Sequence, residues 1–129
     1  MFDNEKLAAK YMFEVGTPYG IDGARAERLA ALVRETAYPY APQSRLGKIL
    51  CDADIEYVGD RDFEHQADCF RMELARQGKE FSDREWYEFE IRFLEGISFF
   101  TATGRQLYEA GRTNNLAALR NRLAAATEK

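Results

Sequence analysis

The chain has 129 residues, which suffices for one hydrophobic core but not for two. Hydrophobic residues make up 46% of it and charged residues 31%, a balance typical of soluble globular proteins and not of disordered chains. The net charge is −4 and the arginines are interleaved with acids, so no basic stripe forms and nucleic-acid binding is not expected.

The N-terminal segment and the two cysteines indicate a cytoplasmic protein without a membrane partner. Acidic residues occur at once, without the basic start and apolar centre of a signal peptide. No apolar run approaches the roughly 20 residues that a membrane-spanning helix needs. Cys51 and Cys69 belong to no CxxC motif, and we expect two ordinary buried thiols in a reducing compartment.

Apolar residues recur at three- and four-residue steps, and no segment alternates in the manner of a half-buried strand. This pattern predicts one all-α domain of six or seven helices over residues 1–129. The first predicted helix covers residues 4–15. The second begins after the N-cap Asp22 and ends before Pro39.

The third predicted helix covers residues 44–58 and ends at Gly59. A fourth starts at an aspartate cap, Asp60 or Asp62, and ends at Gly78. Apolar residues at helical steps between the cap and Gly78 are expected to face the core.

The pair Ser82 and Glu85 predicts a capping box that opens a fifth helix. Beyond it we expect a short helix and then a final one over residues 114–126, with Gly104 and Gly111 as turn residues. Most aromatic residues of the fifth helix recur at helical spacing, and they are therefore expected in the core.

Two carboxylates, Asp52 and Asp54, stand in an apolar part of the third predicted helix. Residues two apart on a helix point about 200° apart, so the two cannot bind one ion together. We expect Leu46, Ile49 and Leu50 to form the buried face, with Asp54 at its flank and Asp52 in water. A half-buried Asp54 needs a partner, and both an arginine salt bridge and a metal remain open.

Several segments resemble the C-terminal portion of HD-domain proteins, which are all-helical, metal-dependent phosphohydrolase-like proteins of bacteria. The resemblance runs from about Leu7 to Leu119, and its most specific part is the DAD segment followed by Gly59. It implies an HD-like topology for this chain. The segments that carry it are KILCDADIEYVG, RDF, FRMEL, SDREWYEFEIRFLEG, FFTATGRQL and NNLAAL.

The resemblance also implies a metal ligand. In that family a His, a His-Asp doublet and a final Asp hold the metal, and the final Asp matches Asp54, with Asp52 as second choice. The chain begins after the place of the first His and the doublet, and it contains no HD dipeptide. Carboxylates alone hold Mn²⁺, Fe²⁺ or Zn²⁺ poorly, so no cofactor is expected for the chain alone. A completed site would take Mn, Fe or Mg.

Other side chains offer little chemistry of their own. His65 is the only histidine and is expected to be exposed, so no Ser-His-Asp or Cys-His arrangement is predicted. Arg71, in FRMEL, is the candidate anion binder, because it lies on the helix that follows Asp54 and could reach it. Its alternative role is ordinary pairing on a helix surface. Phe99 and Phe100 are expected to be partly exposed and to suit a contact with another chain.

Three functions remain open from the sequence. The first is a non-catalytic or incomplete HD-like helical module that acts through a homodimer or another protein partner. The second is part of a metal-dependent phosphohydrolase acting on a phosphate ester or nucleotide, with histidine ligands supplied from elsewhere. A weaker third is a metal-free small-molecule sensor that uses Arg71 and Asp54. Catalysis by the chain alone is not expected.

Overall fold

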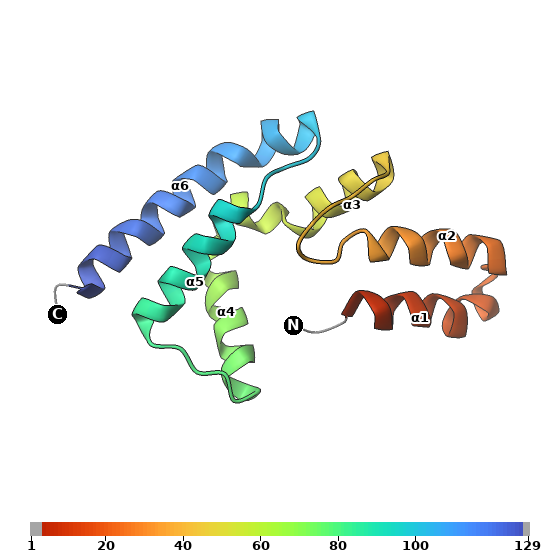
Figure 1. Cartoon of the computed structure of the whole chain (residues 1–129), viewed down its shortest axis with the longest axis horizontal. Coiled ribbons are helices and arrows are strands. Elements are labelled where there is room, and N and C mark those ends of the chain that lie inside the picture. Colours follow the sequence, from red (N-terminus) through yellow and green to blue (C-terminus); the bar gives the residue numbers. More distant parts are fainter. Residues whose placement is uncertain (1–3, 128–129) are drawn as a thin grey trace. The chain divides into compact units, whose positions relative to one another are not determined.

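The computed structural model describes residues 4–127, and this part of the chain is all-helical, without a β-strand (Figure 1). No helix within it is long and apolar enough to cross a membrane. Its six α-helices are α1 (Asn4–Gly16), α2 (Gly23–Arg34), α3 (Arg45–Asp54), α4 (Phe63–Arg76), α5 (Asp83–Gly96) and α6 (Ala102–Thr127). Two short 3₁₀ helices join them, η1 (Thr17–Tyr19) and η2 (Glu56–Gly59).

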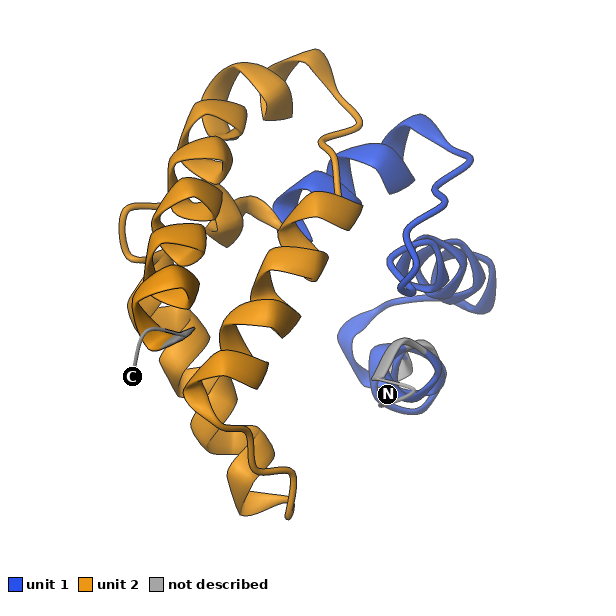
Figure 2. Cartoon of the chain, turned by 60° about the vertical axis from the view of Figure 1, so that its left-hand side comes forward, with its two compact units in different colours: residues 1–54 blue, residues 55–129 orange. Residues whose placement is uncertain are grey.

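The chain divides into two compact units, which Figure 2 colours separately. Unit 1 is residues 1–54 and contains α1, η1, α2 and α3. Unit 2 is residues 55–129 and contains η2 and α4 to α6. The prediction that the whole chain is one domain stays a prediction.

Unit 1 is built on α1 packed against α2. Asp22 caps α2 as predicted, because its Oδ1 accepts a hydrogen bond from the backbone N–H of Arg25 at 2.8 Å. The hydrophobic residues that unit 1 buries fully within its described part are small: Ala26, Ala30 and Cys51. Unit 1 therefore holds little large apolar volume in its interior.

A carboxylate from the end of α2 holds the N-terminus of α3. Glu35 Oε2 accepts the backbone N–H groups of Gln43 at 2.7 Å and Ser44 at 2.9 Å. These bonds lower the pKa of Glu35, and the Ser44 backbone N–H is the largest cause. Gly47 leaves room for this arrangement, since a Cβ there would lie 2.0 Å from the Glu35 carboxylate.

Unit 2 buries the large apolar side chains of the chain. The predicted capping box opens α5: the N–H of Glu85 donates to Ser82 Oγ at 3.3 Å, and the Ser82 N–H donates to Glu85 at 2.9 Å. From there α5 packs along α6. The buried hydrophobic residues of this unit are Ile55, Val58, Phe63, Ala67, Leu74, Trp86, Leu94, Ile97, Phe99 and Leu119.

Phe99 and Phe70 differ from expectation. Phe99, expected to be partly exposed, is buried, and its ring centroid lies 5.5 Å from that of Tyr108. Only Phe100 of the predicted contact pair is half-buried. Phe70, expected in the core, is 43% exposed although its ring lies beside Trp86. The helical pattern predicts correctly which face of α4 points to the core. It does not predict how far the neighbouring elements cover that face.

The third helix is shorter than predicted, because it ends at Asp54 and not at Val58. The chain then tightens into η2, in which the Val58 N–H donates to the carbonyl of Ile55 at 3.1 Å. Ile55 and Val58 are both fully buried. The change from α-helix to 3₁₀ helix thus turns the side chains of Ile55 and Val58 inward. A continued α-helix would direct these two side chains differently.

The two helices predicted near the C-terminus are in fact one, α6, and Gly104 and Gly111 lie inside it and not in turns. Gly111 is where α6 meets η2 (Glu56–Gly59). A Cβ on Gly111 would lie 1.9 Å from the carbonyl oxygen of Gly59. The glycine is therefore needed for close approach of two backbones, a role that leaves the helix unbroken.

Asn115 reinforces the same contact one turn further along α6. Its Nδ2 donates to the carbonyl oxygens of Val58 and Asp60, both at 2.9 Å. These carbonyls lie at the C-terminal end of η2, where backbone carbonyl groups of a helix need partners from outside it. A single amide side chain thus fixes the end of η2 to α6.

Candidate functional site

The two aspartates of the DAD segment lie in opposite environments to those expected. Asp52 is 5% exposed, whereas Asp54 is exposed. The reason is that α3 buries the side that carries Gly47 and Cys51, not the side with the large apolar residues. The expectation of a solvated Asp52 and a half-buried Asp54 was therefore wrong.

Asp54 has a hydrogen-bonding partner within unit 1. The hydroxyl of Tyr40 donates to its Oδ2 at 2.9 Å. Across residues 4–127, no three His, Cys, Asp or Glu side chains gather closely enough to hold a metal ion. The assignment of Asp54 or Asp52 as a metal ligand stays a prediction. Each of the two residues would supply one carboxylate group to such a metal site.

Arg71 is bound into unit 2. Its guanidinium donates to Asp83 Oδ1 at 2.9 Å and to the carbonyl oxygen of Phe81. It also lies 5.8 Å from the ring centroid of Trp86, within the range of a cation–π contact. These contacts fix the loop between α4 and α5, and the anion-binding role predicted for Arg71 remains untested.

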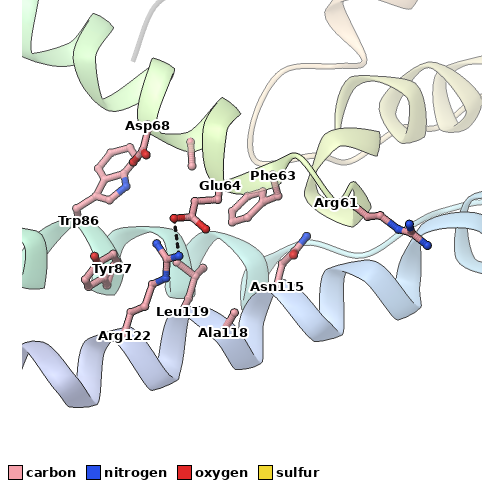
Figure 3. Close-up of a pocket in the computed structure, with 11 residues that line it drawn as sticks. Arg61, Phe63, Glu64, Asp68, Trp86, Tyr87, Asn115, Ala118, Leu119 and Arg122 are labelled. Atoms are coloured by element: carbon pink, nitrogen blue, oxygen red, sulfur yellow. Dashed lines mark ion pairs between the residues drawn. The ribbon is translucent and has the colours of Figure 1, made fainter.

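A small cleft opens where α4, α5 and α6 of unit 2 meet (Figure 3). Its volume is about 80 Å³, well below the roughly 300–1,000 Å³ of typical ligand pockets. Trp86 and Phe63 supply apolar walls, and Glu64 forms an ion pair with Arg122 across it (Figure 3). Arg61 points away from that pair (Figure 3).

Glu64 and Arg122 form an ion pair within this cleft. The carboxylate of Glu64 is the largest cause that raises the pKa of Arg122, and the hydroxyl of Tyr87 contributes to the same end. The amide of Asn115 is likewise engaged with the carbonyls of η2. The cleft is too small for a typical organic ligand, and it is best described as a packed, polar seam.

A buried carboxylate in unit 2 was missed by the sequence analysis. Glu90 lies on α5 between Trp86 and Leu94 at four-residue steps, and all three are buried. Desolvation raises the pKa of Glu90 to about 7. The signal was present in the sequence, since position 90 falls in the core-facing stripe of the helix.

A cysteine–histidine pair on α4 was also missed. Cys69 is exposed, contrary to the expectation of two buried thiols, while Cys51 is buried as expected. The Sγ of Cys69 lies 3.8 Å from Nε2 of His65, which is exposed as predicted. The spacing of four residues was visible in the sequence, so the statement that no Cys-His arrangement exists was wrong.

Neither a family model, nor a curated protein, nor a solved structure matches this chain.

Proposed function

We propose that this chain is a non-catalytic, HD-domain-like helical module that acts by associating with a second copy of itself. The HD-like topology belongs to the proposal and rests on the DAD, FRMEL and SDREWYEFEIRFLEG segments of the sequence. The main support for self-association is the orientation of α3. Its large apolar side chains are exposed, whereas Gly47 and Cys51 on its other side are buried.

The exposed side of α3 is defined by Leu46, Ile49 and Leu50, which we call the α3 apolar face. Their exposed fractions are 60%, 48% and 37%. Residues at i, i+3 and i+4 form one continuous strip on a helix, the arrangement that packs against another helix. Complete burial of such a side chain contributes about 1.5–3 kcal/mol, so covering the part of each that is still exposed would be favourable.

A second copy of the chain is a suitable cover for this face. In a two-fold pair each chain presents the same patch to the other, so an apolar strip meets an apolar strip without any further partner. Unit 1 adds to the exposed apolar surface on α1, where Leu7 and Tyr11 are 57% and 56% exposed. An exposed apolar strip, such as the one on α3, is typical of protein–protein contacts.

The test is the mass of the full chain in solution, measured by light scattering and sedimentation over a range of concentrations. We expect wild type to form dimers and Leu46→Glu to remain monomeric with an unchanged circular dichroism spectrum. Leu107→Glu is the matched control, because Leu107 on α6 is 61% exposed and Leu46 is 60% exposed. A monomeric wild type, or equal dimerisation of both variants, would contradict self-association through α3.

The second candidate function is a part of a metal-dependent phosphohydrolase whose histidine ligands come from elsewhere. The favouring observation is that Asp54 is exposed and its carboxylate is held by a single described hydrogen bond, from Tyr40. The other carboxylate oxygen can still accept a metal. This function would make the chain one component of an assembly that hydrolyses a phosphate ester or nucleotide.

Metal content separates the two functions. The purified chain is incubated with Mn²⁺, and bound metal is measured alongside the Asp54→Ala variant and with generic phosphate esters as substrates. Stoichiometric metal that is lost in the variant would favour the phosphohydrolase part. Equal, negligible metal in both forms would favour the binding module.

A further inference from the structure

The exposed face of α4 carries three soft or borderline metal-binding groups at helical spacing. His65, Cys69 and Met72 stand at positions i, i+4 and i+7, which fall within one narrow stripe of a helix. All three are exposed, and Met72 is 52% exposed. An exposed thioether next to an exposed thiol and imidazole has no role in the core of unit 2.

The geometry of the first two groups suits a shared cation. The distance between Cys69 Sγ and His65 Nε2 is 3.8 Å. Bond lengths of about 2.3 Å to sulfur and about 2.0–2.1 Å to nitrogen place the two ligand atoms about 3.5–3.8 Å apart as the angle opens from tetrahedral to trigonal. A cation can therefore bind both atoms without rearrangement of α4.

Met72 is the candidate for a third ligand, because of the direction that long side chains take on a helix. A long side chain in a helix points back over the turn that precedes its own Cα. Met72 stands three residues after Cys69 on the same stripe of α4, and by this rule its side chain extends toward Cys69. The stripe thus carries one nitrogen and two sulfurs, and the flexible Met72 side chain allows its sulfur to turn toward a cation held by the other two groups.

We propose that His65, Cys69 and Met72 form a surface site for a soft monovalent cation, Cu⁺. Thiolate and thioether sulfur select Cu⁺, and a set of one imidazole and two sulfurs completes a three-coordinate ion within one chain. On binding, the Cys69 thiol releases its proton to solvent as the sulfur–metal bond forms, and the His65 nitrogen donates its lone pair. The site needs no second copy and does not depend on self-association through α3.

The second thiol of the chain does not compete for this role. Cys51 is fully buried, and its S–H donates to the carbonyl oxygen of Glu35 at 3.2 Å. Burial raises the pKa of the Cys51 thiol to about 11, which keeps it protonated near neutral pH. Cys51 therefore serves as an internal control.

The experiment is an anaerobic titration of the reduced full chain with Cu⁺ in competition with bicinchoninate, a coloured Cu⁺ chelator. We expect one ion per chain. His65→Ala, Cys69→Ser and Met72→Leu should each lower the affinity by more than about tenfold, since even residues outside a coordination sphere change metal affinity by 10–100-fold. X-ray absorption should report one nitrogen and two sulfur neighbours.

The controls are Cys51→Ser and Met12→Leu, which change the other thiol and another thioether and should leave the affinity unchanged. Circular dichroism verifies that each variant folds, and the α4 changes are all at exposed positions. If the Cu⁺ affinity depended on Cys69 alone, a single surface thiol would explain the binding. That result would overturn the three-residue site. Equal affinity in all variants, or no binding, would overturn it as well.

Discussion

Glu90 is a carboxylate in a buried position of α5. It is 4% exposed in the core-facing stripe of α5, and burial raises its pKa from 4.5 to about 7. Between these two pH values the folded chain binds more protons than the unfolded chain, so stability falls as the pH rises through this window. The shift corresponds to roughly 3 kcal/mol of lost stability once the carboxylate is ionised.

The first prediction concerns Glu90→Gln, which removes the charge and keeps the size. At pH 8 the variant should be more stable than wild type by about 1–3 kcal/mol, and the difference should shrink as the pH falls from 7 toward 4.5. Urea unfolding followed by circular dichroism at several pH values measures it. Glu88→Gln on the same helix is the control, and an equal effect there would argue against desolvation of Glu90 as the cause.

The second prediction concerns Glu35, whose pKa is lowered by its bonds to Ser44 and Gln43. A lowered pKa means that the stabilisation is complete above the ordinary value of 4.5 and is lost as the pH falls through the lowered one. Glu35→Gln should therefore unfold at a lower temperature than wild type at pH 7, and the gap should close in acid. Thermal melts at pH 7 and pH 3 measure this.

The matched control for Glu35 is Glu27→Gln, an exposed glutamate on α2. A charge effect unrelated to the α3 N-terminus would lower the melting temperature of both variants alike. Such a result would contradict the capping role of Glu35.

At the scale of elements, the contact of α6 with η2 depends on the absence of a side chain at Gly111. Both backbones approach so closely that a Cβ has no free volume, and the Asn115 amide fixes the same junction by two hydrogen bonds. Backbone atoms cannot swing aside as a flexible side chain can. The junction is therefore sensitive to a single methyl group.

The third prediction follows from that contact. Gly111→Ala should destabilise the chain by about 1–3 kcal/mol, the usual cost of forcing extra volume into a packed region, despite the better helix propensity of alanine. Chemical denaturation measures it. Gly23→Ala is the control, because no atom lies within 4 Å of a Cβ at Gly23. A loss of the same size at Gly23 would contradict the steric explanation.

At the scale of the whole molecule, the two units differ in what they bury. Unit 2 encloses Trp86, Leu94 and other large apolar side chains, whereas unit 1 encloses alanines and a cysteine. Local stability follows the density of buried apolar contacts. The units are therefore expected to open with different free energies.

The fourth prediction is that backbone amides of α4 to α6 exchange with solvent deuterium more slowly than those of α1 to α3. Hydrogen exchange on the full chain at low concentration measures it. Protection of α3 should rise with concentration in wild type and not in Leu46→Glu, because self-association would cover the α3 apolar face. Uniform protection at every concentration would contradict both the difference between the units and the association.

The sequence by itself determined the helical class of this protein and several of its helix ends. Asp22 and Ser82 were identified correctly because a cap bonds to an N–H group only three residues away. Helical periodicity correctly predicted that Phe63, Ala67 and Leu74 of α4 face the core, since spacing along a helix is a local property.

Only the tertiary structure decided which side of α3 is buried, that α6 is continuous, and that Asp52 is enclosed while Cys69 is exposed. These outcomes depend on neighbours far away in the sequence. Gly111 fits against Gly59, and the Glu35 carboxylate holds the start of α3 from the end of α2. A residue's own pattern predicts its face on a helix, but burial is a property of the atoms that pack against that face.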